Sequence, residues 1–254
     1  MTISMPARRL IGKIACKIFN LSSSGKAKFE CPICGYSGPF LAIDTMSGIR
    51  RHAQCPRCNA FERHRMQYLV VKEILRHTNT ATLRMLHFAP EPVLRTCFSR
   101  LFTQYETADL SMAGVHHHVD LQQLPFDDRS YDLVFASHVL EHIPDDDKAI
   151  AEIHRVLRPN GIAILPVPIV SSMTIEYPAP YPLEEGHVRA PGLDYFKRYE
   201  RYFAHVEQYR SDSLPEKHQL YIYENRSRWP TKECPLRTSM PGKRHFDIVP
   251  VCYV

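Results

Sequence analysis

A chain of 254 residues can bury one large core, or one core and a small attached module. Its hydrophobic fraction of 44% is ordinary for a globular protein, and no apolar run reaches the roughly 18 residues that a membrane span needs. The net charge of +5 permits an anionic partner without requiring one. Lys13 and Lys17 break the apolar N-terminal segment, which argues against a signal peptide, and two CxxC pairs favour metal binding over disulfides. We therefore expect a cytoplasmic protein without a transmembrane segment.

Residues 1–28 form a basic leader in which Leu10, Ile14 and Ile18 recur at helical spacing, with lysines on other faces. A basic amphipathic helix over residues 8–21 can make peripheral contact with a membrane surface. The alternative that we favour is a helix packed on the main domain, or a frayed terminus.

Two CPxC pairs, at residues 31–34 and 55–58, each form a tight turn that directs two thiolates toward one ion. Gly35 and Asn59, directly after the second cysteine of each pair, suit such a turn. Four thiolates complete a closed structural Zn²⁺ site and leave no coordination position for catalysis. We therefore predict a small zinc ribbon over residues 29–60, the alternative being buried free cysteines. The predicted ligands are Cys31, Cys34, Cys55 and Cys58.

A helix is expected over residues 61–77, because Met66, Val70 and Ile74 recur at helical spacing. We assign residues 61–80 to a segment that connects the ribbon to the main domain. The charged residues at the start of the helix either form a solvated face or hold the ribbon against that domain.

Residues 83–89, 105–110 and 115–121 are predicted to form three strands, with a helix over about 93–102 after the first. Asp109 lies near the carboxyl end of the second strand, where a carboxylate can bind both hydroxyls of a ribose. The alternative for this residue is a solvated loop acid. The three histidines that begin the third run alternate across a strand, so they make a poor metal site.

Residues 131–170 are predicted to form a strand, a helix and a second strand. Acidic residues at 145–147 suit a helix start, and the sequence RPNG at 158–161 ends the helix because proline cannot continue it. Such a unit is a parallel βαβ crossover, whose ligands bind at the carboxyl ends of the strands. Ser137 and His138 follow the first strand, so we expect them to line the ligand cleft.

The segment FDDRSYDLVFASHVLEHIPD, followed by EIHRVLRPNGIAIL, resembles the fourth strand, the following helix and the fifth strand of class I S-adenosylmethionine-dependent methyltransferases. The sequence HFAPEP after a four-cysteine ribbon resembles a sub-group of bacterial methyltransferases that is often associated with polysaccharide or secondary-metabolite pathways. The resemblance implies an α/β fold: a Rossmann-like, mostly parallel seven-stranded sheet flanked by helices, with a small N-terminal zinc ribbon. It implies S-adenosylmethionine as the cofactor.

The same resemblance implies where the cofactor binds. Most class I methyltransferases carry glycines after the first strand, where this chain has Ala89, Pro90 and Glu91, and we interpret these as a variant loop that still contacts the cofactor. Asp120 takes the family position that contacts the adenine amino group, and Leu121 would pack near the base. The predicted cofactor site also includes Asp109, Ser137 and His138.

Residues 171–192 form a long segment rich in Pro and Tyr at the carboxyl edge of the sheet, where a substrate lid belongs. His187 is our candidate for removing a proton from an acceptor hydroxyl, and Arg189 for holding an anionic acceptor group. His142 is a second candidate base, since an imidazole titrates near working pH. The alternatives are loop anchoring for His187 and Arg189, and a hydrogen bond within the fold for His142.

A helix over about 193–203 and strands over 205–210 and 219–225 complete a predicted methyltransferase domain of residues 61–225. Residues 226–254 are assigned to a C-terminal extension whose end could add an edge strand or dock on the domain.

The function that these features favour is S-adenosylmethionine-dependent methyl transfer to a small-molecule acceptor, such as a hydroxyl of a sugar or of a pathway intermediate. One alternative is an RNA methyltransferase that docks RNA through the ribbon, although the mild net charge and the lack of a basic stripe interleaved with aromatics argue against nucleic acid. The other is a non-catalytic scaffold, which the glycine-free loop favours and Asp109 and Asp120 oppose. The sequence defines neither the acceptor nor the oligomeric state. The arginines of the RNA alternative are Arg50, Arg51, Arg57, Arg63 and Arg65.

Overall fold

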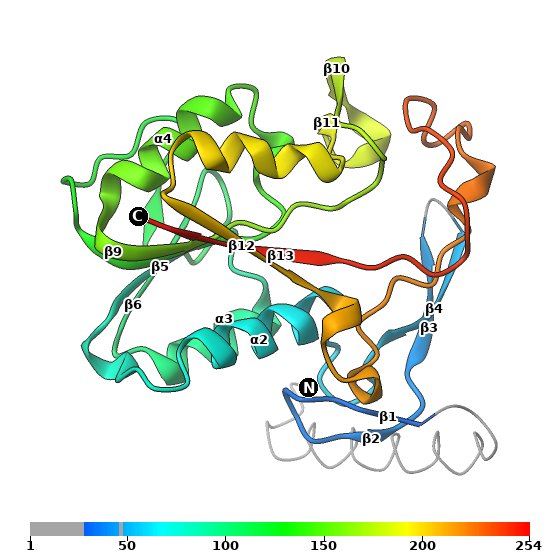
Figure 1. The fold of residues 1–254 in the computed structure, drawn as a ribbon, viewed down its shortest axis with the longest axis horizontal. Coiled ribbons are helices and arrows are strands. Elements are labelled where there is room, and N and C mark those ends of the chain that lie inside the picture. The colour runs from blue at the N-terminus through cyan, green and yellow to red at the C-terminus, as the bar shows by residue number, and fades with distance from the viewer. Residues whose placement is uncertain (1–27, 46–47) are drawn as a thin grey trace, which may run out of the picture.

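The structure, a computed structural model, describes residues 28–45 and 48–254, so the helix predicted at residues 8–21 lies outside the described residues. One seven-stranded sheet forms the centre of the molecule, with helices on both faces (Figure 1). Its strands in spatial order are β12 (His205–Arg210), β13 (Ile248–Tyr253), β9 (Leu157–Ile164), β8 (Tyr131–Ala136), β5 (Arg84–Phe88), β6 (Gln104–Asp109) and β7 (His117–His118).

The sheet is parallel from β9 to β7, whereas β13 runs antiparallel to both of its neighbours. The strand order reverses at β5, because the next strand in sequence, β6, lies on one side of it and β8 on the other. In a doubly wound sheet, ligands bind in the crevice at such a reversal, beyond the carboxyl ends of the strands. The prediction of a mostly parallel seven-stranded sheet is therefore confirmed.

Two hydrophobic cores cover the two faces of the sheet. Helices α2 (Glu62–Ile74) and α3 (Pro92–Leu101) lie on one face, and α4 (Asp146–Val156) lies on the other (Figure 1). The strands are buried on both sides, so neighbouring side chains of one strand serve different cores. Leu133 of β8 packs in the cluster with Phe98 of α3, whereas Val134 packs in the cluster with Ile153 of α4.

Helix α4 begins as its sequence predicts and ends earlier than expected. The Asp145 side chain accepts a hydrogen bond from Lys148 N at 3.0 Å and caps the helix. Strand β9 then begins directly at Leu157, so residues 158–161 belong to the strand and not to a separate loop. Asn160 adopts the positive φ of 65° that the Asn-Gly pair predicts. The strand ends at residue 164, six short of the predicted end at 170.

The C-terminal part of the fold corrects the predicted domain boundary. Residues 219–225 form no strand of the sheet and make only isolated bridges, Arg51 to Tyr223 and Ile222 to His245. The remaining strand is β13, which is inserted between β12 and β9 and is buried along most of its length. The division at residue 225 is therefore wrong, because residues 226–254 complete the central sheet.

The segment between β9 and β12 is more regular than a loop. Strands β10 (Ile175–Tyr181) and β11 (His187–Ala190) form an antiparallel hairpin within the predicted lid, with a 3-10 helix over Pro182–Glu184 between them. The helix expected at 193–203 is a 3-10 helix over Leu193–Arg201, η4, which buries its tyrosines against the sheet.

The four-cysteine ribbon consists of two small hairpins joined firmly to the main domain. Its strands are β1 (Phe29–Glu30), β2 (Ser37–Gly38), β3 (Leu41–Thr45) and β4 (Gly48–Gln54). The buried guanidinium of Arg65 on α2 donates to the carbonyl oxygens of Ala53 and Ala60 at 3.0 and 2.7 Å, and of His218 and Gln219 at 3.0 and 2.6 Å. Of the two alternatives for the charged start of α2, the one in which it holds the ribbon is thus supported.

Candidate functional site

A pocket of about 430 Å³ opens at the strand reversal, and we call it the central pocket. Ala89 and Glu91 line it after β5, and Ser137 and His138 line it after β8. Its outer wall comes from the ribbon, the predicted lid and the C-terminal region. The residues from these three parts include Thr45, Arg50, Glu184, His187, Arg226 and Arg237.

Strained backbone conformations gather at this pocket. Ala89, His138 and Glu185 all line it and have φ values of 44°, 56° and 57°, in the left-handed region that L residues rarely adopt. Ala89 takes this conformation at the turn where most class I methyltransferases have glycine, and its N–H donates to Ala108 O at 2.9 Å. Such strain persists only where the surrounding structure enforces it and is typical of binding sites.

Glu91 is fixed by two partners on α2, a guanidinium and an imidazole. Arg63 Nη2 lies 2.5 Å from Oε1 and His64 Nε2 lies 2.8 Å from Oε2. Burial alone would raise the pKa of Glu91, but the hydrogen bonds and charges of His64 and Arg63 hold that pKa well below its usual range. The loop that replaces the glycine turn therefore carries a carboxylate of fixed position.

Ser137 is held from the same helix. Gln67 Nε2 donates to its Oγ at 2.9 Å, and both side chains are buried. Helix α2 thus fixes one side chain after β5 and another after β8, which makes this end of the pocket rigid.

The two predicted acids after β6 and β7 lie outside the lining of the central pocket. Asp109 Oδ1 accepts from Ser111 N at 2.8 Å and Met112 N at 2.7 Å, which forms a tight turn at the end of β6. Asp120 is exposed, and the Gln122 side-chain amide reaches its two oxygens at 3.1 and 3.2 Å. Both carboxylates stay predicted cofactor ligands.

Leu121 does not lie as predicted. Its side chain is only 3% exposed and belongs to the core cluster on the α4 face. It therefore has little surface to offer to a base. Pro90 does not line the central pocket, although its neighbours Ala89 and Glu91 do.

The side chains of Glu141, His142 and His187 converge where the predicted lid borders the pocket. One atom from each side chain lies within 4.8 Å of the others, and the two imidazole rings are edge to face with centroids 4.6 Å apart. Burial lowers the pKa of His187 to about 4, so its ring is neutral at neutral pH. For Glu141, burial would raise the pKa, but His138, with Nδ1 3.4 Å from Oε1, and the other two imidazoles hold it below its ordinary value.

Arg189 does not hold an acceptor, which corrects the prediction for this residue. Its side chain is 3% exposed and lies outside the lining of the central pocket. The guanidinium donates to the carbonyl oxygens of Leu140 at 2.7 Å, Ile143 at 2.6 Å and Pro144 at 3.0 Å, and to Glu176 Oε2 at 3.0 Å. Arg189 therefore ties β11 to the turn that carries Glu141 and His142.

Sequence reasoning missed several pocket residues. Glu141 stands beside His142 directly after a predicted strand, and that adjacency was a usable signal. Arg226 and Arg237 come from the region assigned to an extension, and no local pattern marks them. Arg226 donates to Glu224 at 2.8 Å and Arg237 to Glu184 at 2.8 Å, so the pocket wall carries paired charges.

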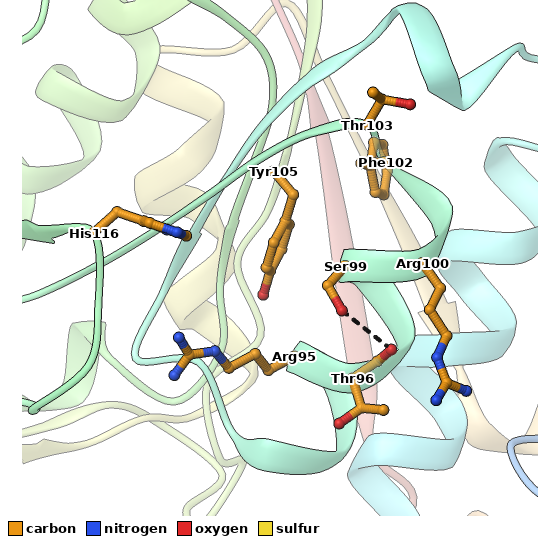
Figure 2. A pocket seen from close by; sticks show the side chains of 8 residues that line it. All are labelled: Arg95, Thr96, Ser99, Arg100, Phe102, Thr103, Tyr105 and His116. Carbon is orange, nitrogen blue, oxygen red and sulfur yellow. Dashed lines mark hydrogen bonds between the residues drawn. The ribbon is translucent and has the colours of Figure 1, made fainter.

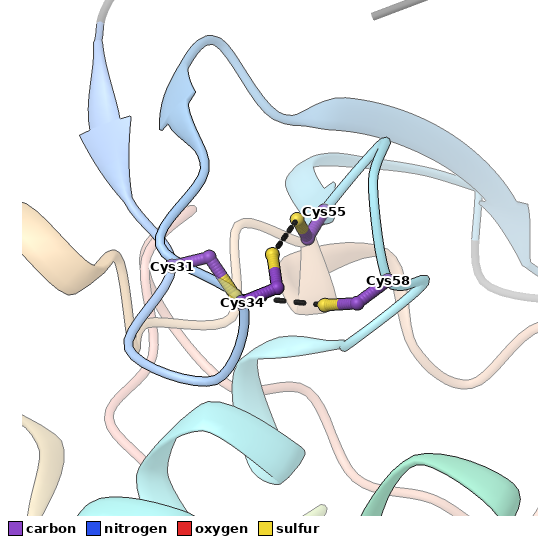
Figure 3. Close-up of side chains that lie close together, drawn as sticks. All are labelled: Cys31, Cys34, Cys55 and Cys58. Carbon is purple, nitrogen blue, oxygen red and sulfur yellow. Dashed lines mark hydrogen bonds between the residues drawn. The ribbon is translucent and has the colours of Figure 1, made fainter. Parts of the chain in front are cut away.

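The four cysteines of the ribbon converge as predicted (Figure 3). Their sulfurs all lie within 4.8 Å of one another, and the Cys31–Cys58 and Cys34–Cys55 pairs are both 3.6 Å apart. Four sulfurs about 2.3 Å from a central Zn²⁺ would lie at roughly this spacing, so the site fits the ion. Gly35 and Asn59 have the positive φ values of 67° and 62° that the turns require.

A second hollow of about 550 Å³ lies beside α3 (Figure 2). Arg95, Arg100 and His116 give it a basic lining, but none of the predicted site residues reaches it. The Arg95 guanidinium donates to Gly114 O at 2.5 Å, so one of the cations that line this hollow already has a partner within the protein.

Comparison with known proteins finds a family match for the centre of the sheet. Residues 81–165, from before β5 to the end of β9, match the family described as a methyltransferase domain. The methyltransferase resemblance of this region is thereby confirmed, while the sub-group with a zinc ribbon stays a prediction. Within residues 28–45 and 48–254, no helix has the length and hydropathy of a membrane span.

Several curated proteins are similar over short segments. The chain is 42% identical over 59 residues to an uncharacterized 37.1 kDa protein in transposon Tn4556 of Streptomyces fradiae (23% of this chain, 17% of that protein). It is 45% identical over 47 residues to a demethylmenaquinone methyltransferase of Staphylococcus epidermidis (18% and 20%). It is 41% identical over 54 residues to the 27-O-demethylrifamycin SV methyltransferase of Amycolatopsis mediterranei (21% and 20%). The chain spans about a fifth of the length of these relatives.

Among solved structures, the chain is similar to an S-adenosylmethionine-dependent methyltransferase from Mesorhizobium loti. The sequence identity is 14%, the match covers 74% of this chain and 98% of that one, and the TM-score is 0.48.

Proposed function

We propose that this protein transfers a methyl group from S-adenosylmethionine to a hydroxyl of a small-molecule acceptor. The observation that carries the proposal is the placement of the central pocket. It opens at the strand reversal of a sheet whose residues 81–165 match a methyltransferase domain, and it joins the predicted cofactor loop to two imidazoles. The relatives named for demethylmenaquinone and demethylrifamycin are methyltransferases of small molecules, which supports this acceptor class.

The side chains at the carboxyl ends of the strands fit the cofactor. Asp109 uses Oδ1 for its own turn, and no residue of the described chain donates to Oδ2, which is therefore available to ribose hydroxyls. Met112 lines the pocket beside it and is 38% exposed, so it offers apolar surface to a base. The bound cofactor supplies a methyl group already activated by its sulfonium. Ala89, Ser137 and their neighbours would position it and exclude water.

The acceptor end of the pocket would be formed by His142 and His187. Both imidazoles face the cavity, and neutral His187 is able to accept a proton from an acceptor hydroxyl. The charged pairs of the wall, Arg226 with Glu224 and Arg237 with Glu184, give the acceptor a polar lining without a large net charge. This favours a neutral, hydroxyl-rich acceptor over a polyanion.

RNA docking through the ribbon is less well supported. Three of the five arginines of that hypothesis are used inside the protein: Arg50 pairs with Glu62 at 2.6 Å, Arg63 pairs with Glu91, and Arg65 is buried. A phosphate-binding face needs free surface cations. We also propose that the ribbon binds Zn²⁺ through its four cysteines and serves the fold, while Thr45 and Arg50 help to enclose the pocket.

Calorimetric titration with S-adenosylhomocysteine tests the proposed function. We expect one binding site per chain, and no affinity for RNA beyond a weak, salt-sensitive background. A folded, zinc-loaded protein that shows no heat of binding would overturn the proposal in favour of the non-catalytic scaffold. Tight, salt-dependent binding of RNA would instead favour the RNA methyltransferase.

A further inference from the structure

Glu141 is buried in a way that needs a partner. Its side chain is 1% exposed, and neither carboxylate oxygen accepts a hydrogen bond from any residue in the described chain. The His138 imidazole approaches it, with Nδ1 3.4 Å from Oε1. An ionised carboxylate left in this state costs free energy, and a protein keeps such a group where something else binds it.

The neighbours of Glu141 are metal ligands by type and by position. His142 and His187 each place a ring nitrogen within 4.8 Å of the carboxylate and of each other. His187 Nδ1 is also buried without a hydrogen-bond partner among the described residues. Ligands about 2.1 Å from one ion lie at most about 4.2 Å apart, so a small side-chain rotation separates this spacing from a bound one.

We propose that Glu141, His142 and His187 bind a divalent transition-metal ion at the acceptor end of the central pocket. Two imidazoles and one carboxylate suit zinc or iron better than calcium or magnesium, which prefer oxygen ligands alone. Three protein ligands leave coordination positions open, as in catalytic sites and unlike the closed four-thiolate set of the ribbon.

The supporting residues hold the three ligands in place. Glu141 and His142 lie on the 3-10 turn Leu140–His142 and His187 lies at the start of β11, and Arg189 joins these two segments through three backbone carbonyls. Glu184 Oε2 lies 3.8 Å from His187 Nδ1 and is itself held by Arg237 and Tyr177. Such outer contacts orient the ligands of a metal site.

The open positions of the ion face the cavity that all three ligands line. If the proposed function holds, the acceptor hydroxyl oxygen occupies one of these positions, where the ion favours its deprotonated form and the proton leaves to solvent. The bound ion then replaces His187 in activating the hydroxyl, because a coordinated imidazole cannot also accept the proton. This last step rests on the proposed function, whereas the metal site itself does not.

Titration with Co²⁺ tests the site in full-length protein whose ribbon is already loaded with zinc. We expect one Co²⁺ per chain with weak visible bands and no sulfur-to-cobalt charge-transfer band, because the ligands are nitrogen and oxygen. Glu141→Gln and His187→Ala should each weaken Co²⁺ binding about tenfold or more. His77→Ala changes a histidine on the exposed surface and should leave binding unchanged.

The thermal stability of Glu141→Gln gives an independent readout. The variant removes a buried, unpartnered charge, so its metal-free Tm should equal or exceed that of the wild type, while the rise in Tm with Co²⁺ should disappear. His142→Ala, at a half-buried position, replaces it as the test if Glu141→Gln fails to fold.

Two results would overturn the metal site: no binding of Co²⁺ or Zn²⁺ beyond the ribbon, or unchanged affinity in the ligand variants. Binding of S-adenosylhomocysteine is measured on the same samples. If the protein binds S-adenosylhomocysteine but no metal, the metal site alone is rejected. If it binds metal but no S-adenosylhomocysteine, the proposed function alone is rejected.

Discussion

The two clusters of potential metal ligands in this protein differ in what surrounds them. The four cysteines converge on one another inside the ribbon, which the buried Arg65 holds against the main domain. Glu141, His142 and His187 also converge, but they line an open cavity at the strand ends. A closed set contributes stability and an open set leaves room for a ligand. The comparison teaches that ligand type and pocket access together separate a structural site from a functional one.

The largest expected effect falls on the closed set. Cys55→Ser removes one of four thiolates, so zinc should be lost and the free energy of unfolding should fall by about 4 kcal/mol or more. Metal analysis and chemical denaturation measure the two effects. Cys97→Ser, at a half-buried cysteine outside the ribbon, is the control and should keep its zinc. Full zinc occupancy in Cys55→Ser would contradict the four-thiolate site.

The connection between the ribbon and the pocket domain gives the next effect. Arg65→Met leaves four backbone carbonyls without their donor, and we expect a loss of about 3–5 kcal/mol in the free energy of unfolding. Denaturant titration measures it, with Arg57→Met as control, because exposed Arg57 donates to one carbonyl, Cys34 O at 3.1 Å, and otherwise lies over the Tyr36 ring. Equal losses in the two variants would show that the ribbon is not held through Arg65.

Burial lowers the pKa of a second histidine, His87, which unlike His187 lies outside the lining of the central pocket. Burial lowers the pKa of His87 from 6.5 to about 3, and its Nδ1 lies 2.8 Å from the Tyr105 hydroxyl. The unfolded chain takes up the proton near pH 6.5 and the folded chain only near pH 3, so stability is full above pH 6.5 and is lost as the pH falls toward 3.

We expect His87 to contribute about 1.4 kcal/mol per pH unit to this loss within that window. Denaturant titration of His87→Gln between pH 6 and 4 should therefore show a shallower dependence than the wild type, while exposed His77→Gln should match the wild type. A wild-type slope in His87→Gln would mean that His87 is protonated in the folded state.

The parallel centre of the fold could be predicted because its signals are local. The apolar run at residues 131–136 and the capping Asp145 are visible in a few neighbouring letters. Strand β13 was predicted only as a possible edge strand, since Pro250 argues against an interior strand, and only the structure shows that it lies between β12 and β9. The role of Arg189 was equally hidden, because its acceptors are backbone carbonyls more than forty residues away.

The candidate site was predicted in part for the same reason. The cysteine pairs and the imidazoles at residues 142 and 187 carry recognisable chemistry, so sequence alone marked them. The outer wall of the pocket depends on chain segments that only folding brings together, such as Arg50 of the ribbon and Arg226 of the C-terminal region. Residue type therefore marked the cysteines as metal ligands and the two imidazoles as candidate bases, and tertiary packing decided what encloses them.

The cofactor end of the pocket has its own test. Asp109→Ala removes the carboxylate proposed for the ribose, and we expect the affinity for S-adenosylhomocysteine to weaken by about 1–3 kcal/mol. Calorimetry measures it, with exposed Asp127→Ala as the matched control. An unchanged affinity would show that Asp109 only supports its own turn through Ser111 and Met112.

The smallest effect is expected at the turn without glycine. Ala89→Gly relieves the strain of a φ of 44° but raises the backbone entropy of the unfolded chain, and each effect is about 1 kcal/mol. The two nearly cancel, so the free energy of unfolding and the affinity for S-adenosylhomocysteine should both stay within about 0.5 kcal/mol of the wild type. Denaturation and calorimetry check this. A large gain in affinity would mean that the Ala89 side chain obstructs the cofactor, because glycine at this position changes little besides the missing methyl group.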